Sequence, residues 1–167
     1  MGGVRPLLDV FNRLPPEQAE KELSAVCASP VWVAAVVAGL PYEDLDALLR
    51  TSAAAFDRLS WDQVAAAVDA HPRIGQRPAG DGQEAAWSRR EQGGVHGAAD
   101  ELAEANRAYE KRFGFVFLVF ASGKSAEQIL DAAQQRLGND DETERRCVRA
   151  ELGKIVRLRL ERLVAAA

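Results

Sequence analysis

The sequence has few of the residues that build disulfide frameworks and metal sites. It contains two cysteines, Cys27 and Cys147, and two histidines, His71 and His96, among 167 residues. Two cysteines so far apart in the chain form neither a disulfide framework nor a cluster of metal ligands. We therefore expect both to be free thiols in a reducing compartment, and we expect no metal site.

Long apolar runs are also absent. No stretch of about 18 apolar residues occurs, so the sequence predicts no membrane-spanning helix. Residues 1–8 lack the apolar core of a signal peptide, and the final residues are not a peroxisomal signal, so we expect a cytoplasmic protein. The formal net charge of −4 gives no electrostatic reason to bind nucleic acid or anionic lipid, although a few arginines can still bind a small anion.

Helix-forming residues, by contrast, are abundant. Alanine, leucine, arginine and glutamate dominate, whereas the alternation of β-branched residues that is typical of strands is nearly absent. The length suits one domain with a sizeable core. We therefore predict an all-α fold, a single-domain helical bundle of about eight helices that covers residues 1–167, with no sheet.

Apolar residues at helical spacing place the first five helices. Ser29-Pro30 is expected to begin the third helix, and Ser60 with Gln63 is expected to form a capping box at the fifth. In chain order, the apolar positions are Leu7, Val10, Phe11 and Leu14; Ala19, Leu23 and Val26; Trp32, Val33, Val36, Val37 and Leu40; Leu45, Leu48, Leu49 and Phe56; and Val64, Ala67 and Val68.

The helical pattern stops at His71 and resumes further along the chain. Residues 71–82 are predicted to be irregular, because Pro72 and several glycines interrupt the periodicity. A helix through Trp87 follows, and Gly93-Gly94 ends it. A long helix comes next, marked by Leu102, Ala105, Tyr109 and Phe113.

The long helix is predicted to end at Gly114, which stands in the position of a C′ glycine. The apolar run Phe115–Phe120 would suit a buried strand, but no partner strand exists elsewhere, so we interpret it as a buried extended piece or a short helix. Ser125 and Asp141, each followed three residues later by Gln or Glu, are predicted to cap the last two helices.

His71 is the first candidate for chemistry. It precedes Pro72, which disfavours a helical backbone at the histidine, so the imidazole would lie at the end of a helix beside a loop. Histidine titrates near neutral pH and suits proton transfer. The alternative is a loop histidine that has no role.

A second candidate is the polar helix face formed by Ser88, Glu91 and Gln92. These residues stand at positions i, i+3 and i+4, so on a helix they share one face that presents a hydroxyl, a carboxylate and an amide. Judged by spacing alone, a solvated helix surface explains the pattern better. A metal site is a poorer interpretation, because the spacing of His71, Glu91 and His96 does not resemble that of zinc ligands.

Two arginines lie within the strongly apolar last helix. Arg157 and Arg159 are two residues apart, so they point to different faces of the helix. One can lie outside and pair with Glu161, four residues on from Arg157, while the other points toward the core. An inward arginine requires an anion, and either a substrate carboxylate or an internal glutamate would provide one.

Several short motifs, in this order, resemble the OHCU decarboxylase family, whose substrate is 2-oxo-4-hydroxy-4-carboxy-5-ureidoimidazoline. The resemblance covers about Leu8 to Leu163, and the loop at residues 121–124 is shorter than in the family. The matching segments are Phe11-Asn12, Cys27-Ala28-Ser29-Pro30-Val31-Trp32, His71-Pro72-Arg73-Ile74-Gly75, Ser88-Arg89-Arg90-Glu91-Gln92-Gly93, Asn106 with Tyr109, Phe113-Gly114-Phe115-Val116-Phe117, Arg136-Leu137-Gly138-Asn139 and Leu158-Arg159-Leu160.

The resemblance implies an all-α homodimer that converts OHCU to (S)-allantoin in urate degradation, with no metal or organic cofactor. It implies catalytic roles for His71 and Glu91, and a substrate-holding role for Arg159. The other residues that it implies to line the substrate are Pro72, Ser88, Gln92 and the backbone of Phe117, Leu118, Val119, Phe120 and Ala121.

Two other classes of function compete with this one. A non-catalytic helical binding module would explain the helices and the lack of a nucleophile motif, but not these histidine, arginine and polar neighbours. A metal-dependent hydrolase would require ligands that the sequence does not group.

We predict that exhaustive chelation leaves OHCU decarboxylation at its full rate, because the sequence contains no cluster of metal ligands. The measurement is the rate of optically active allantoin formation before and after dialysis against a chelator. Loss of activity that a divalent metal restores would contradict the prediction and favour the hydrolase.

Overall fold

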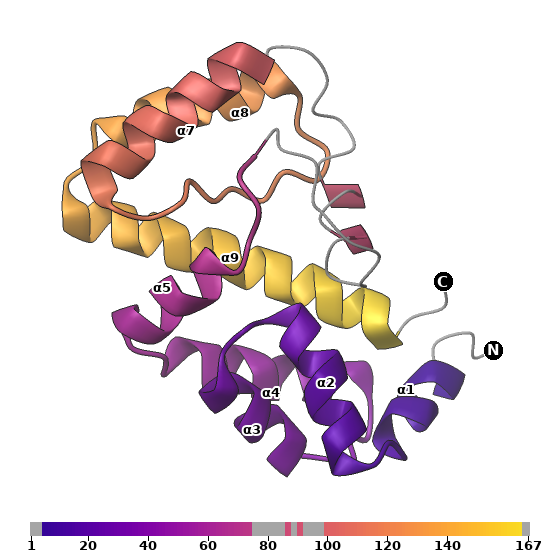
Figure 1. Ribbon diagram of the computed structural model, residues 1–167. Helices are drawn as coiled ribbons and strands as arrows, with labels where there is room; N and C mark the ends of the chain where they lie inside the picture. The colour runs from indigo at the N-terminus through magenta and orange to yellow at the C-terminus, as the bar shows by residue number, and fades with distance from the viewer. Residues whose placement is uncertain (1–4, 75–85, 88–89, 92–98, 165–167) are drawn as a thin grey trace. The chain divides into compact units, whose positions relative to one another are not determined.

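The computed structural model describes residues 5–74, 86–87, 90–91 and 99–164 (Figure 1). In these ranges all regular secondary structure is helical, and the prediction of an all-α fold with about eight helices is confirmed. Ala86, Trp87, Arg90 and Glu91 are also helical. The bounded helices are α1 (Arg5–Asn12), α2 (Pro16–Val26), α3 (Pro30–Ala38), α4 (Leu45–Asp57), α5 (Trp61–Asp69), α7 (Ala99–Phe113), α8 (Ala126–Leu137) and α9 (Asp141–Val164).

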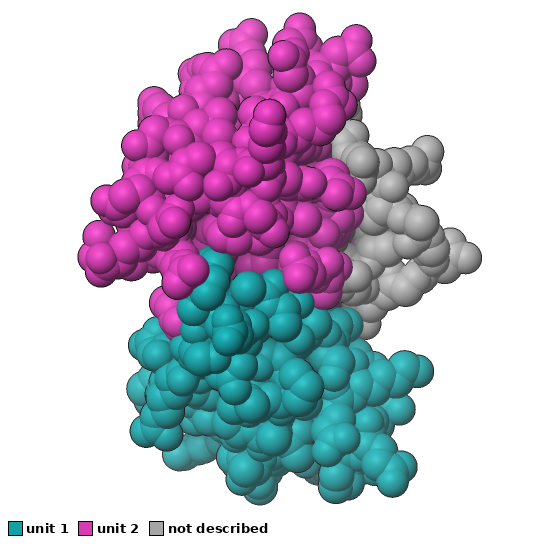
Figure 2. All heavy atoms as spheres, turned by 60° about the vertical axis from the view of Figure 1, so that its left-hand side comes forward, with its two compact units in different colours: residues 1–67, 153–167 teal, residues 68–152 magenta. Residues whose placement is uncertain are grey.

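The chain divides into two compact units, which Figure 2 draws in different colours. Unit 1 comprises residues 1–67 and 153–167, and unit 2 comprises residues 68–152. That the chain forms one domain over residues 1–167 stays a prediction. No helix within the described ranges combines the length and the apolar character that a membrane span requires.

Unit 1 is built on the predicted apolar stripes of α2, α3 and α4. The indole Nε1 of Trp32 donates to the hydroxyl and carbonyl oxygens of Ser52, each at 3.3 Å, so the one polar atom of this buried side chain has partners. The buried residues of these helices are Ala19, Leu23 and Val26; Trp32, Val33 and Val36; and Leu48, Ser52 and Phe56.

The apolar stripe of α1 differs from the predicted one. Leu7 and Val10 are exposed, whereas Phe11 is buried together with Leu8. Leu8 and Phe11 are three residues apart on one face, and a helix of eight residues presents only a narrow stripe to a core. The prediction of a helix here is confirmed, but the choice of Leu7 and Val10 as its inner positions is wrong.

Three helices begin at the predicted serine caps. The hydroxyl of Ser29 accepts from the Trp32 N–H at 3.3 Å. Ser60 with Gln63, and Ser125 with Gln128, form reciprocal capping boxes in which each serine hydroxyl accepts from a backbone N–H and each glutamine returns the bond.

The predicted cap of α9 is wrong by one residue. The carboxylate of Asp140, not that of Asp141, accepts from the Thr143 N–H, at 2.7 Å. Helix α9 begins one residue after this aspartate, so Asp140 occupies the position from which a side chain can reach the third residue of the helix. Glu144, which the sequence pattern assigned to the cap, is instead fully buried.

Unit 2 has a core formed by α7, α8 and the chain between them, and α7 lies against α8 (Figure 1). Gly114 follows α7 with a φ of +85°, which confirms the predicted C′ glycine. Residues 116–121 then continue without helix, turn or bend, so the apolar run is the buried extended piece. The core consists of Ile74, Leu102, Tyr109, Phe117, Val119, Ala121, Ala126, Ile129 and Ala133.

A buried ion pair joins α8 to α9 within unit 2. The Nε of Arg136 donates to Oε1 of Glu144 at 2.6 Å, and the Tyr109 hydroxyl donates to the same oxygen at 2.5 Å. Asn139 donates to Oε2 of Glu144 at 3.0 Å, so both carboxylate oxygens have partners. Burial lowers the pKa of Arg136, but the hydrogen bond and charge of Glu144 outweigh this and raise it, so the guanidinium stays charged.

We predict that Glu144→Gln lowers the free energy of unfolding by about 3–5 kcal/mol, because it leaves the Arg136 charge buried without its counterion. The matched control is Glu142→Gln, also in the first turn of α9, whose side chain is 85% exposed in its pair with Arg146. This control should lose less than about 1 kcal/mol. Urea unfolding measures both, and equal losses would contradict the prediction.

Candidate active site

The predicted catalytic histidine lies immediately after α5. The His71 N–H donates to the Val68 carbonyl at 2.9 Å, which closes the last turn of the helix, and Pro72 follows outside it. Both residues are partly buried. The imidazole is therefore carried at the C-terminal end of a helix, as the sequence predicts.

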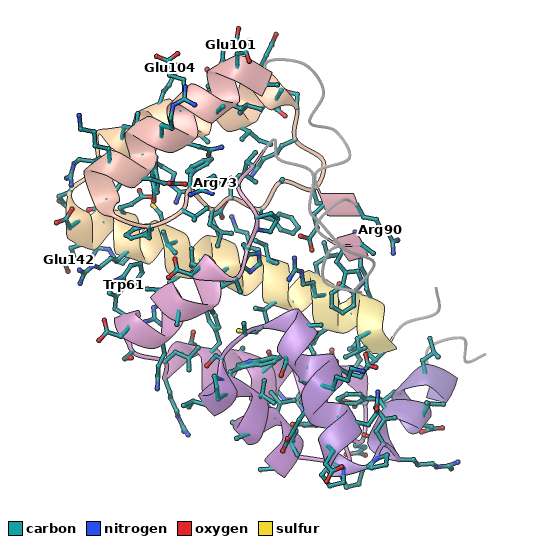
Figure 3. All side chains as sticks on the ribbon, viewed as in Figure 1. Trp61, Arg73, Arg90, Glu101, Glu104 and Glu142 are labelled. Carbon is teal, nitrogen blue, oxygen red and sulfur yellow. The ribbon has the colours of Figure 1, made fainter. Side chains whose placement is uncertain are left out.

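Two bonds to α7 hold the loop that follows His71. The guanidinium of Arg73, which Figure 3 labels, makes a bidentate pair with Glu110, with Nε–Oε1 at 2.5 Å and Nη2–Oε2 at 3.1 Å. The amide of Asn106 donates to the Ile74 carbonyl at 2.8 Å, from a buried position. This bond supports the structural role expected for Asn106, and the loop bearing His71 and Pro72 is attached to a rigid helix at two points.

The predicted catalytic glutamate is buried. Glu91 is 6% exposed, and Trp87, four residues before it, is also buried, whereas Arg90, which Figure 3 labels, is exposed. The interpretation of this helix face as a solvated surface is therefore wrong at Glu91. A buried carboxylate is costly unless partners compensate its charge. Ser88 and Gln92, the other two residues of the predicted face, lie outside the described residues.

The extended segment Phe117–Ala121 is buried along most of its length. Phe117, Leu118, Val119 and Ala121 are at most 3% exposed, and Phe120 is partly buried. The Leu118 carbonyl accepts from Arg136, and the Phe120 N–H donates to Glu151. These two backbone groups, and the Ala121 carbonyl that accepts from the Lys124 N–H at 3.0 Å, are already bound by the protein, so the candidates for a ligand are among the remaining backbone groups of the segment.

The two arginines of α9 point to opposite sides, as predicted. Arg157 is exposed and its Nε lies 3.0 Å from Oε1 of Glu161, whereas Arg159 is 1% exposed and donates to the Ala25 carbonyl at 3.3 Å. Cys27 is free and buried in the same unit. Burial raises the pKa of the Cys27 thiol to about 12, although a hydrogen bond from the Ser29 backbone and the charge of Arg159 lower it in part.

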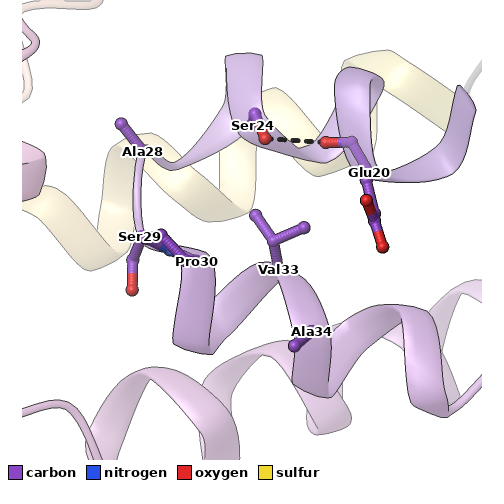
Figure 4. A pocket seen from close by; sticks show the side chains of 7 residues that line it. All are labelled: Glu20, Ser24, Ala28, Ser29, Pro30, Val33 and Ala34. Atoms are coloured by element: carbon purple, nitrogen blue, oxygen red, sulfur yellow. Dashed lines mark hydrogen bonds between the residues drawn. The ribbon is translucent and has the colours of Figure 1, made fainter. Parts of the chain in front are cut away.

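The hollow between α2 and α3 is unsuited to the predicted chemistry. It has a volume of about 480 Å³, and the Ser24 hydroxyl on its wall donates to the Glu20 carbonyl at 2.7 Å (Figure 4). None of the predicted site residues lines it. A second hollow of about 310 Å³ adjoins the loop after Pro72 and is lined by Arg73, Ile74, Asn106 and Glu110, among others.

The predicted site residues are divided between the two units. His71, Pro72, Glu91 and Phe117–Ala121 belong to unit 2, and Arg159 belongs to unit 1. Within the described ranges, no group of three or more His, Cys, Asp and Glu side chains is arranged to hold a metal ion. The catalytic and substrate-binding roles of all these residues stay predictions.

Comparison with known proteins decides the family. The sequence model of the family described as OHCU decarboxylase matches residues 12–161. This chain belongs to the OHCU decarboxylase family. The resemblance drawn from the short motifs is thereby confirmed.

This OHCU decarboxylase family member has relatives in several organisms. It is 33% identical over 141 residues to the 2-oxo-4-hydroxy-4-carboxy-5-ureidoimidazoline decarboxylase of Amia calva, covering 81% of each chain. It is 29% identical to the uric acid degradation bifunctional protein TTL of Arabidopsis thaliana, covering 88% of this chain and 48% of that one. A crystal structure of an OHCU decarboxylase in the presence of (S)-allantoin has a TM-score of 0.73 and 25% identity, covering 86% and 96% of the two chains.

Sequence reasoning about this OHCU decarboxylase homologue missed the buried pairing of Arg136 with Glu144. Both positions carried a signal. Arg136 falls three residues after Ala133 on the buried stripe of α8, and Glu144 falls four residues before Val148 on that of α9. Opposite charges on two inward stripes that neighbour each other in the chain indicate a buried pair.

We predict that Arg159→Lys lowers kcat/KM for OHCU about tenfold or more, because lysine lacks the planar fork that grips a carboxylate. Arg157→Lys should leave kcat/KM nearly unchanged, since an exposed pair such as Arg157–Glu161 contributes little. Steady-state kinetics of both variants make the comparison. Equal losses at the two positions would show that the inward face of α9 is not what binds the substrate.

Proposed function

We propose that this protein decarboxylates OHCU to (S)-allantoin in the degradation of urate, as a carboxy-lyase that uses no metal or organic cofactor. The observation that carries the proposal is the family match over residues 12–161. The loop of His71 and Pro72 anchored to α7, together with the buried Glu91, supports it. A homodimeric state and a cytoplasmic location are part of the proposal and stay predictions.

The chemistry of the substrate explains why no cofactor is required. OHCU carries a hydroxyl and a carboxylate on one ring carbon. When the bond to the carboxylate breaks, CO₂ leaves and its bonding electron pair stays on that carbon. The imine next to that carbon, which is conjugated with the ring carbonyl, takes up this electron density, so the substrate supplies the electron sink that a cofactor would otherwise provide.

The protein must then orient the carboxylate out of the ring plane and deliver a proton to one face. We assign proton delivery to His71, with Glu91 positioning the imidazole. Arg159 would hold the substrate carboxylate or a carbonyl, with Pro72, Ser88 and Gln92 lining the substrate. Free backbone N–H groups of the Phe117–Ala121 segment would stabilise the developing negative charge. Delivery of the proton to one face accounts for the formation of one enantiomer.

We predict that His71→Asn keeps the fold and lowers the rate of (S)-allantoin formation about 10²–10⁴-fold, which is the usual contribution of a general acid or base. Glu91→Gln should lose activity similarly, because the charge that orients the imidazole is removed. Spontaneous decay of OHCU remains as a racemic background. Circular dichroism of freshly generated OHCU measures the stereospecific rate, and thermal melting checks the fold.

The control is His96→Asn, since His96 belongs to none of the family motifs and lies outside the described residues. It should leave the rate nearly unchanged. A His71→Asn protein that melts normally and still forms one enantiomer at the full rate would remove His71 from the mechanism.

A further inference from the structure

The extended segment Phe117–Ala121 is held along one edge by two charged side chains. Nη1 of Arg136, from α8, donates to the Leu118 carbonyl at 2.6 Å. Oε1 of Glu151, from α9, accepts from the Phe120 N–H at 3.3 Å. A strand in a sheet would use a neighbouring strand for these bonds, whereas here two helices supply them.

The geometry of an extended chain determines which groups remain available. Carbonyl and N–H groups of residues i and i+2 point to the same edge, and those of the residue between them point to the opposite edge. Leu118 and Phe120 therefore face the two charged side chains, while Val119 and Ala121 present their N–H groups on the other edge. No hydrogen bond among the described residues uses either of these N–H groups.

The two available N–H groups suit an anionic or carbonyl ligand. Val119 and Ala121 are 3% and 2% exposed, and buried N–H groups nearly always have an acceptor. Two residues of extended chain place the two N–H donors about 7 Å apart. This spacing suits two different oxygens of one small molecule, because a single oxygen could not accept from both donors.

The side chains that hold the segment are both largely buried. The Arg136 guanidinium donates to Glu144, lies 3.4 Å from the Tyr109 hydroxyl and stacks 4.8 Å from the centre of the Phe117 ring. The Glu151 side chain is 13% exposed, and its ion pair with Lys124 is loose, with 3.7 Å between Oε1 and Nζ. The segment is thus attached to a fixed guanidinium at Leu118 and to a largely buried carboxylate at Phe120.

We propose that Arg136 and Glu151 are positioning residues for the decarboxylation, which hold one edge of the Phe117–Ala121 segment so that the Val119 and Ala121 N–H groups face the substrate. Neither side chain touches the substrate. This inference rests on the proposed function, because it assigns the two N–H groups to the developing charge of that reaction.

The experiment at Glu151 compares three variants. Glu151→Ala removes the acceptor for the Phe120 N–H and should lower kcat about 10- to 100-fold, the scale expected when donors are misplaced by about 1 Å. Glu151→Gln keeps an acceptor oxygen and should recover most of the lost rate. Lys124→Met removes only the ion pair with Glu151 and should keep the wild-type kcat.

The experiment at Arg136 separates positioning from stability. Arg136→Lys keeps a positive charge beside Glu144 but removes the Nη1 group that donates to the Leu118 carbonyl. Tyr109→Phe weakens the same buried network and leaves the bond to Leu118 in place. Both variants should melt at lower temperature, but only Arg136→Lys should lower kcat at a temperature where each is folded.

The outcomes are distinguishable from a failure of the proposed function. A wild-type protein that does not accelerate (S)-allantoin formation would overturn the proposed function itself. An active wild type with an unchanged kcat in Glu151→Ala would overturn the positioning role, as would equal losses in Lys124→Met and Glu151→Ala. Equal losses of kcat in Tyr109→Phe and Arg136→Lys would assign the effect to stability alone and also overturn it.

Discussion

The buried pair of Arg136 and Glu144 is the constraint on which unit 2 depends. A charge taken out of water must be matched by an opposite charge and by hydrogen bonds, and here Tyr109 and Asn139 complete the set around the carboxylate. The pair holds α8 against α9, and the hydrogen bond from the Tyr109 hydroxyl to Glu144 connects α7 to both helices. Burial and the bond to Glu144 raise the pKa of Tyr109, so the phenol keeps its proton and remains a donor.

The loops that carry the candidate chemistry obtain their rigidity from these helices. The loop after His71 is bound by Arg73 and Asn106 to α7, and the segment after Gly114 is bound by Arg136 to α8. Each of these two segments is therefore conformationally restricted, although neither has regular secondary structure. Functional groups on loops over a rigid scaffold are common, and here the scaffold contacts are a bidentate ion pair at Arg73 and hydrogen bonds from the buried side chains of Asn106 and Arg136.

Features governed by local physics could be predicted from the sequence. The serine caps at Ser29, Ser60 and Ser125, the glycine at Gly114, and the opposite directions of Arg157 and Arg159 each follow from spacing or backbone geometry within a few residues. The roles assigned to Glu91 and to Phe117–Ala121 came from resemblance, because no local rule distinguishes a buried glutamate in a helix from a solvated one.

Features that depend on partners in another helix do not follow from spacing within one helix. Asp140 and Asp141 are equivalent as caps until the first turn of α9 is placed, and that turn is placed by the burial of Glu144. The inward position of Glu144 depends in turn on Arg136, eight residues earlier in the chain. The inner stripe of α1 was likewise ambiguous, because its apolar residues occupy more faces than one short helix can bury.

The extended segment also has a consequence for the fate of the unfolded chain. Phe115-Val116-Phe117-Leu118-Val119-Phe120 is uncharged, free of proline and composed of residues that favour strands, which is the composition of segments that stack into amyloid-like fibrils. In the folded protein, Arg136 and Glu151 occupy the backbone edge to which another chain would otherwise pair. The same two side chains therefore cover an edge that could otherwise pair with a second chain, and we expect that separating them from the segment favours aggregation of the unfolded chain.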